Sequence, residues 1–250
     1  MCIVNISYEQ HDHYCFVLAA NRDEFFARST APLHVWEDTP HVIGGRDLVS
    51  MGSWLAVTKE KRVAALTNFR DQIVVKDPKT RGSLVADFVQ HEQPASQYIK
   101  NIEREKMKYG GYNLLLYENH HLFFHTNRGT GPLQVKKGIY SISNGHFHTE
   151  WPKTIKGKSL LQDTVSLKGE KLITTLLDRL TDNAVAPDDQ LPSTGVGVEA
   201  ERMLSPLFIQ SPGYGTRCST VVLFNKEGQG LMVERTYETN GKTTDRNMTF

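Results

Sequence analysis

The second residue of the chain combines two groups that catalysis can use. Cys2 directly follows Met1, so removal of Met1 would leave a terminal cysteine with a thiol and a free α-amine. The α-amine has a reference pKa of about 7.7–8.0, so a fraction of it is neutral at pH 7 and can accept the thiol proton. One residue would then supply both nucleophile and base. A retained Met1 would place this nitrogen in a peptide bond and remove the base.

A short charged motif comes after the second apolar run of the chain. Asn21-Arg22-Asp23-Glu24 follows the apolar residues 14–20, so we expect it where a strand ends. Alone, such a motif is typical of a turn with a surface ion pair, and a cysteine beginning a strand is typically a small buried hydrophobe. Their combination favours a catalytic site. Adjacent residues of a strand point to opposite faces, which separates Arg22 and Glu24 from their neighbours.

Three further polar residues lie at or beside expected strand ends. They are Asn68, Asn144 and Arg217. An asparagine amide can donate to a developing oxyanion, and an arginine can bind a carboxylate or polarise a carbonyl. The alternative for each asparagine is ordinary turn chemistry.

The hydrophobic pattern predicts strands at both ends and in the middle of the chain, with two blocks of helices between them. The expected strands cover residues 2–7, 14–20, 33–36, 53–58, 62–68, 112–117, 121–126, 138–143, 217–224, 230–237 and 242–248. The expected helices are one capped by Thr80, one opened by Pro94, and those at 151–161, 170–180 and 199–204. Residues 44–47 and 51–52 are predicted loops, and 182–197 is a predicted loop or lid. This order favours an α+β fold of antiparallel sheets covered by helices.

Composition restricts the class of protein. The 250 residues contain 29 basic and 28 acidic side chains, which gives no positive excess for nucleic acid or an anionic membrane surface. No apolar run approaches the roughly 18 residues of a membrane span, and no secretory signal is visible. Three scattered cysteines, Cys2, Cys15 and Cys218, do not form a disulfide framework. We therefore expect a cytoplasmic protein without a nucleic-acid partner, and nothing in the sequence indicates an oligomeric state.

Other motifs carry weaker signals. Histidines recur at polar turns, but no HExxH or CxxC spacing accompanies them, so we expect no metal site. Gly195-Val196-Gly197 lacks the strand and helix of a dinucleotide-binding loop. Tryptophans are expected in the core or a pocket wall, and they are Trp36, Trp54 and Trp151.

Six ordered motifs together resemble the NRDE family, which includes the eukaryotic transport-and-Golgi-organisation 2 proteins. The motifs are Met1-Cys2, Ala19-Ala20-Asn21-Arg22-Asp23-Glu24, Gly52-Ser53-Trp54-Leu55-Ala56, Ala64-Ala65-Leu66-Thr67-Asn68, Ser143-Asn144 with Trp151-Pro152-Lys153, and Gly215-Thr216-Arg217. The resemblance covers essentially the whole chain. The NRDE family in turn is similar to the N-terminal-nucleophile hydrolases, especially the group of penicillin V acylase and conjugated bile acid hydrolase.

This resemblance implies a fold and a set of roles. The implied fold is a four-layer αββα sandwich, formed by a single domain over residues 1–250. Cys2 matches the nucleophile, and Asp23 matches the carboxylate that orients the α-amine. Asn68 and Asn144 match residues that hold the amine or build the oxyanion hole. Arg217 matches the arginine near the nucleophile.

One departure from the acylase pattern concerns the substrate. Those acylases carry an arginine just before the Asn-x-Asp segment, where this chain has Ala20, whereas Arg22 lies inside the segment. Substrate contacts are therefore expected to differ. The residues expected to contact substrate are Asn21, Arg22, Glu24 and Trp54.

The resulting prediction is a cysteine amidohydrolase without a cofactor. It would cleave a non-peptide C–N bond of a small-molecule amide through a thioester intermediate, after removal of Met1. The alternative is a haem or acyl-lipid binding or trafficking protein on the same fold. His11, His13, His146 and His148 could supply an axial haem ligand, although no Cys-Pro or CxxCH motif is present. A trafficking scaffold is a third option without a sequence feature of its own.

Overall fold

A computed structural model describes residues 2–130 and 133–250, and these form two compact units. Unit 1 comprises residues 2–27, 137–143 and 148–249. Unit 2 comprises residues 28–130, 133–136 and 144–147, with residue 250. Each unit is assembled from several segments of the chain, so no single linker in the sequence marks it. The prediction of one domain over residues 1–250 stays a prediction.

Unit 1 contains an antiparallel sheet of seven strands in the order β10-β1-β2-β12-β13-β14, with β11 beside β12. The strands are β1 (Cys2–Tyr8), β2 (Tyr14–Phe25), β10 (Gly138–Ile142), β11 (Gln210–Ser211), β12 (Tyr214–Asn225), β13 (Gly230–Tyr237) and β14 (Thr243–Thr249). The helices are α3 (Pro152–Gln162), α4 (Gly169–Arg179), α5 (Val198–Leu204) and a 3₁₀ turn, Asp188–Gln190.

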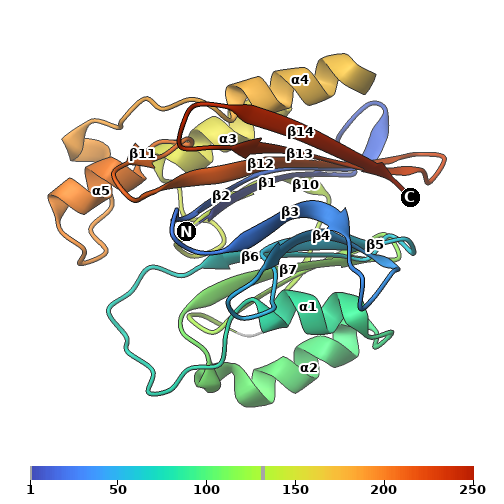
Figure 1. Ribbon diagram of the computed structural model, residues 1–250, viewed down its shortest axis with the longest axis horizontal. Coiled ribbons are helices and arrows are strands. Elements are labelled where there is room, and N and C mark those ends of the chain that lie inside the picture. Colours follow the sequence, from blue (N-terminus) through green and yellow to red (C-terminus); the bar gives the residue numbers. More distant parts are fainter. Residues whose placement is uncertain (1, 131–132) are drawn as a thin grey trace. The chain divides into compact units, whose positions relative to one another are not determined.

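Helices α3 and α4 cover one face of this sheet (Figure 1). Val17, Ala19 and Val221 pack there against leucines of both helices, including Leu160 and Leu176. Because strand side chains alternate, Asn21 and Asp23 share this helix-covered face, whereas Arg22 and Glu24 point to the opposite face. Strand β2 is buried on both faces along most of its length.

Unit 2 contains the second antiparallel sheet, in which seven strands follow each other in sequence order. They are β3 (Thr30–Val35), β4 (Val42–Asp47), β5 (Leu55–Thr58), β6 (Val63–Asn68), β7 (Tyr112–Glu118), β8 (His121–Thr126) and β9 (Leu133–Val135). Its helices are α1 (Ser83–Gln90), α2 (Ala95–Glu105) and a 3₁₀ turn, Lys106–Lys108.

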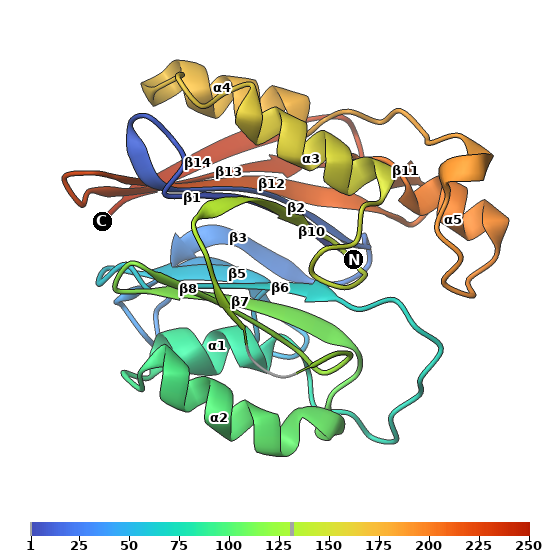
Figure 2. The same cartoon turned by 180° about the vertical axis from the view of Figure 1, so that it is seen from behind.

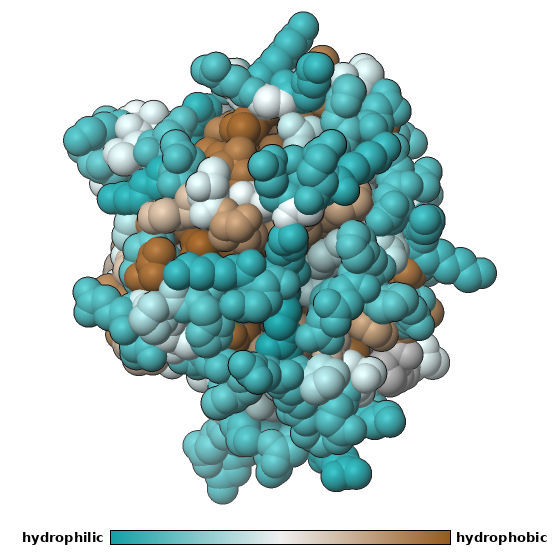
Figure 3. Space-filling model, turned by 90° about the vertical axis from the view of Figure 1, so that its right-hand side faces the viewer, coloured by the Kyte–Doolittle hydropathy of each residue, from teal (hydrophilic) through white to brown (hydrophobic). Residues whose placement is uncertain are grey.

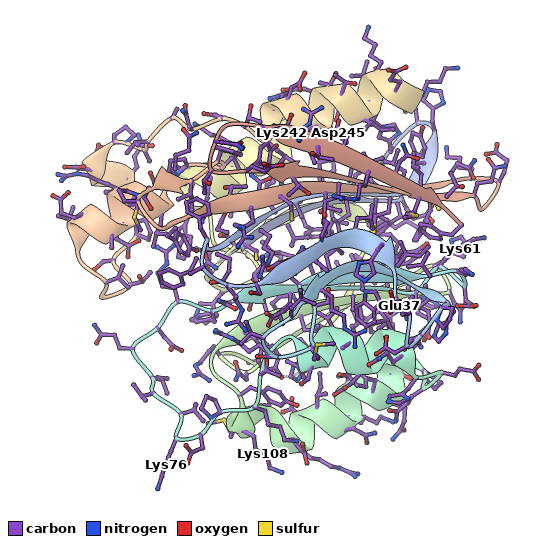
Figure 4. All side chains as sticks on the ribbon, viewed as in Figure 1. Glu37, Lys61, Lys76, Lys108, Lys242 and Asp245 are labelled. Atoms are coloured by element: carbon purple, nitrogen blue, oxygen red, sulfur yellow. The ribbon has the colours of Figure 1, made fainter. Side chains whose placement is uncertain are left out.

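Helices α1 and α2 cover one face of the unit 2 sheet (Figure 2). Leu84, Phe88 and Ile99 lie on the apolar sides of these helices and pack on Leu114 and Leu116. Apolar residues three and four positions apart produce such a side. Lys76 lies on the long loop between β6 and α1 (Figure 4).

The predicted ends of two strands, β2 and β12, differ from those in the structure. Strand β2 continues through Phe25, so Asn21-Arg22-Asp23-Glu24 lies inside the strand and not after it. The reason is non-local: β1 and β12 pair with this stretch from both sides, which holds polar residues in an extended backbone. Strand β12 likewise begins at Tyr214, so Arg217 is an interior residue and does not open the strand.

Other differences concern β4, α1 and β9 in unit 2. Gly44-Gly45-Arg46-Asp47 was expected as a loop but belongs to β4. A Cβ at Gly44 would lie 2.8 Å from the Leu55 carbonyl oxygen, so this glycine permits close strand packing. Helix α1 begins after Gly82, and Thr80 instead accepts a hydrogen bond from Ser83 Oγ through its carbonyl oxygen (2.9 Å). The short strand β9 was not predicted.

The predicted α+β class is confirmed, with two antiparallel sheets that each carry helices on one face. Within the described residues, no helix combines the length and apolarity that a membrane crossing requires. The face drawn in Figure 3 is mainly hydrophilic, with separate small apolar areas.

Candidate functional site

Cys2 lies beside Arg22 on neighbouring strands of unit 1. The antiparallel register pairs Cys2 of β1 with Arg22 of β2, and pairs Arg22 with Cys218 of β12. Directly opposite residues of an antiparallel pair point to the same face of the sheet. Cys2 is partly buried, and its backbone carbonyl oxygen accepts a hydrogen bond from Ser143 Oγ (3.2 Å). The structure thus brings together the predicted nucleophile and Arg22.

The face that carries Cys2 also carries Arg22 and Glu24. Only 5% of the Arg22 side chain is exposed, and its guanidinium lies 4.0 Å from the Glu24 carboxylate. Glu24 also accepts a hydrogen bond from the Phe25 amide (2.9 Å). The cation is therefore next to the thiol, and the carboxylate lies two residues further along the strand.

Arg217 occupies an irregularity in β12. Thr216 pairs with Asp23 and Cys218 pairs with Arg22, so Arg217 is an extra residue between the two pairs. Such a bulge redirects a side chain and is common beside active sites. The Arg217 guanidinium donates to the carbonyl oxygens of Phe25 (3.0 Å) and Phe26 (3.4 Å). Burial, together with the neighbouring charge of Arg22, lowers the pKa of Arg217.

Asp23 lies on the helix-covered face of the same strand. Only 2% of this residue is exposed, and its carboxylate accepts a hydrogen bond from Thr216 Oγ1 (2.7 Å). Burial raises the pKa of Asp23, while the ammonium of Lys153 and the Thr216 hydrogen bond act in the opposite direction. In the register Asp23 is one residue beyond the Cys2–Arg22 pair, towards the amino end of β1. This position suits a carboxylate that interacts with the backbone nitrogen of Cys2.

The electrostatic surroundings of Cys2 do not by themselves produce a thiolate. Burial raises the pKa of the Cys2 thiol, and the Asp23 carboxylate raises it further, whereas the Arg22 guanidinium lowers it. A thiol with a raised pKa needs a base at neutral pH. The prediction that the α-amine is this base depends on removal of Met1, which lies outside the described residues.

Asn21 has a structural environment. Its amide nitrogen donates to the carbonyl oxygens of Leu180 (2.9 Å) and Leu207 (2.8 Å), and its oxygen accepts from Ser219 Oγ (2.6 Å). The residue is buried. These contacts connect β2 to segments that follow α4 and α5. Substrate contact by Asn21 stays a prediction.

In unit 2 the structure brings Asn68 and Asn144 together. The Asn144 amide donates to the Asn68 carbonyl oxygen (2.8 Å). Arg70 donates to Asn144 twice, from its backbone nitrogen to the carbonyl oxygen (2.7 Å) and from its guanidinium to Oδ1 (3.4 Å). Asn144 is fully buried and directly follows Ser143, the residue that donates to the Cys2 carbonyl oxygen. That the groups of the two units form one site stays a prediction.

Trp54 is also a residue of unit 2. It is 8% exposed, and its ring packs so closely on Gly45 that a Cβ there would lie 2.2 Å from the ring. This agrees with the expected place in a core or pocket wall. Its contact with substrate stays a prediction.

Four residues around Cys2, Asp23 and Asn144 were not predicted as site residues from the sequence. Ser143, Lys153 and Thr216 were quoted only as parts of motifs, and Arg70 was not singled out at all. Arg70 is two residues after Asn68, and such a spacing places two side chains on one side of an extended chain. Lys153 and Thr216 had no comparable local signal, because their contacts join distant segments.

The histidines considered for haem have ordinary surroundings. The Nε2 atom of His11 lies 3.1 Å from the Thr164 carbonyl oxygen, and its Nδ1 accepts from the His13 amide (3.2 Å). His146 packs edge-on against Phe69, and His148 is exposed. The haem and acyl-lipid alternatives stay predictions.

Comparison with known proteins identifies relatives of the whole chain. The model of a family described as Transport and Golgi organisation 2 matches residues 1–239. The Transport and Golgi organization protein 2 homolog of Homo sapiens is 30% identical over 256 residues, which cover 94% of this chain and 92% of that protein. The Bos taurus homolog is 29% identical with the same coverage.

A solved structure resembles the fold at low sequence identity. The C2A mutant of conjugated bile acid hydrolase from Clostridium perfringens has a TM-score of 0.53 and 9% identity, covering 99% of this chain and 92% of that one. This likeness shows the fold alone. The predicted αββα fold type is thereby confirmed.

Proposed function

Because the chain belongs to the Transport and Golgi organisation 2 family and has the fold of N-terminal-nucleophile hydrolases, we propose that it is a cysteine amidohydrolase. The observation that carries this proposal is the placement of Cys2 at the start of β1, beside Arg22 and one register position from Asp23. A nucleophile, a cation and a carboxylate thus surround the amino end of one strand. The expected substrate is a small molecule with a non-peptide amide bond.

In the proposed reaction, the α-amine of mature Cys2 accepts the thiol proton, and the thiolate attacks the amide carbon. The C–N bond then breaks, the leaving amine takes the proton from the α-ammonium, and a thioester remains. The same α-amine next deprotonates a water molecule that attacks the thioester. The acid product leaves, and the proton returns to the sulfur.

The surrounding residues have distinct proposed roles. Asp23 orients the α-amine and stabilises, through opposite charge, the ammonium that forms when the amine accepts the thiol proton. Asn68 and Asn144 are the proposed donors or supports for the oxyanion, and Arg70 fixes the orientation of the Asn144 amide. Arg22 stabilises the thiolate, since it lowers the pKa of Cys2. Arg217 is the proposed arginine near the reacting carbonyl.

Two further observations support this proposal. The solved bile acid hydrolase is named as a C2A mutant, so that hydrolase also has a cysteine at its second position. In this chain Cys2, Cys15 and Cys218 are thiols and not disulfides, which fits the reducing cytoplasm that we propose as its location.

The test is hydrolysis of a panel of small N-acyl amides by the protein and its Cys2→Ala variant. We expect the variant to lose at least about 10³-fold in turnover, because the covalent route needs the sulfur. Cys15→Ala is the matched control, since Cys15 is a buried thiol of the same unit. Equal turnover by the wild type and Cys2→Ala would contradict the proposal.

A further inference from the structure

The buried side of α3 contains a charged residue. The buried positions of this helix are Lys153, Thr154, Gly157, Leu160 and Leu161. Lys153 is only 2% exposed, and its ammonium donates to the Leu204 carbonyl oxygen (3.2 Å). A buried ammonium is costly unless an anion and hydrogen bonds compensate it. The helix therefore brings a cation under the sheet at a specific place.

That place is near the start of β1. Gly157 lies so close to Asn5 of β1 that a Cβ on it would meet the Asn5 side chain at 1.9 Å. Lys153 is four residues earlier, on the same side of the helix. Helix α3 begins at the end of the sheet where β1 begins (Figure 2). Lys153 thus lies beneath the end of β1 that carries Cys2.

Asp23 is the buried carboxylate on this face of the sheet. It is 2% exposed, and its oxygen accepts from Thr216 Oγ1. Thr216 Oγ1 also accepts a hydrogen bond from the Ile209 amide (2.9 Å), so the hydroxyl is held with its hydrogen towards Asp23. The charges that favour the ionised carboxylate are the amino-terminal ammonium of the chain, Lys153 from α3 and Arg22 from β2 itself. The thiol of Cys2 is the titratable neighbour on β1. Lys153 and Asp23 are thus opposite charges, both removed from water.

We propose that Lys153 is a positioning residue that keeps the Asp23 carboxylate ionised under the sheet, ready to hold the α-amine of mature Cys2. The last part rests on the proposed function, whereas the effect of Lys153 on Asp23 does not. Without the Lys153 ammonium, one of the charges that oppose the effect of burial is lost, and the neutral acid is favoured more. A neutral Asp23 stabilises the α-ammonium formed by proton transfer less and leaves the amine poorly oriented towards the thiol. Lys153 acts through Asp23 and touches no reacting atom.

The direct test is a carboxyl-carbon NMR titration of Asp23, assigned with Asp23→Asn, in the wild type and in Lys153→Met. We expect Lys153→Met to reduce the acid dissociation constant of Asp23 about tenfold, at the lower end of the effect of one opposite charge. Lys153→Arg keeps the charge and is expected to titrate close to the wild type. A purely packing role for Lys153 would not move this titration.

The matched control is Lys156→Met. Lys156 lies in the same helix but is more exposed and pairs with Asp182 (2.8 Å), so its loss should leave the Asp23 titration unchanged. If Lys153→Met does not fold, Lys153→Gln removes the charge while keeping a donor for the Leu204 carbonyl oxygen, and the same reduction is expected. The proposal is overturned if Asp23 titrates in Lys153→Met and Lys153→Gln as it does in Lys156→Met. A reduced dissociation constant in a protein whose Cys2→Ala variant hydrolyses amides normally supports the role of Lys153 and overturns the proposed function alone.

Discussion

The two faces of β2 use one short motif in different ways. On the helix-covered face, Asn21 has all its contacts within the protein and Asp23 is buried against Thr216. On the opposite face, Arg22 lies beside Cys2, and Glu24 is 24% exposed and loosely paired with Arg22. Four consecutive residues therefore belong to two environments. Because side chains alternate along the strand, Asn21 and Asp23 have structural contacts on the covered face, whereas Arg22 and Glu24 lie on the face of the proposed nucleophile.

Asp23 is the residue that joins the two halves. It lies on the covered face but adds to the electrostatic field at Cys2. A buried carboxylate with a raised pKa is costly for stability, and such groups concentrate at functional sites. We therefore expect substitutions on the covered face of β2 to lower the stability of the fold, and substitutions on the opposite face to change the reactivity of the Cys2 thiol.

The largest expected effect is on the covered face. Asn21→Leu leaves the Leu180 and Leu207 carbonyl oxygens and the Ser219 hydroxyl without this partner. We expect the free energy of unfolding to fall by about 3 kcal/mol, at roughly 1–3 kcal/mol for each buried group that loses its hydrogen bond. Urea unfolding followed by circular dichroism measures the change. A loss below about 0.5 kcal/mol would show that these contacts do not hold β2 in place.

A smaller loss is expected for Thr216→Val, also on the covered face. The hydroxyl donates to Asp23 and accepts from the Ile209 amide, so its removal affects one buried anion and one buried donor. We expect a loss of about 2 kcal/mol in unfolding free energy and a higher pKa for Asp23. Thr236→Val in β13 is the control, because it makes the same change in the same sheet. Equal losses in both variants would contradict a special role for Thr216.

On the opposite face the expected change concerns reactivity. Because burial raises the pKa of Cys2, its alkylation by iodoacetamide should keep accelerating above pH 9 in the folded chain that retains Met1. Arg22 opposes this increase, so Arg22→Met should move the midpoint to still higher pH and slow alkylation at pH 8 by about three- to tenfold. Rates are measured by peptide mass spectrometry. Arg235→Met, which removes a partner of Asp245 on β14 (Figure 4), is the control and should leave the rate unchanged.

The smallest effect is expected for Glu24→Gln. The carboxylate is partly exposed, and the ion pair with Arg22 is long at 4.0 Å, so we expect a change in unfolding free energy below about 0.5 kcal/mol. Glu24→Gln and Asn21→Leu change residues on opposite faces of β2, so the losses in unfolding free energy of the two variants can be compared directly. Losses of equal size at Asn21 and Glu24 would remove the distinction between the two faces.

Local patterns in the sequence predicted much of the fold. Continuous apolar runs located β1, most of β2 and β6, and residues at helical spacing located α1 and α4. The bounds at the site depended on distant partners. Strand β2 extends through Phe25 because β1 and β12 flank it, and the bulge at Arg217 exists only in the pairing of β12 with β2. The spacing of apolar residues and the positions of turn-forming residues contain no information about such distant partners.

Part of the candidate site was also predicted from the sequence. The resemblance supplied Cys2, Asp23 and the two asparagines, and the structure brings Cys2 near Asp23 and Asn68 near Asn144 within their units. Lys153 and Arg70 could not be found in this way, because their roles follow from packing of a helix on β1 and from a contact with a residue 74 positions later.

The measurement that tests the central idea most directly is mass spectrometry of the amino terminus after reaction with an electrophile under native conditions. We predict a chain that begins with Cys2 and carries one label on its sulfur, while the buried Cys15 and Cys218 stay unlabelled. Cys2→Ser should remain unlabelled. A chain that retains Met1, with Cys2 labelled only after unfolding, would rule out Cys2 as an amine-assisted nucleophile.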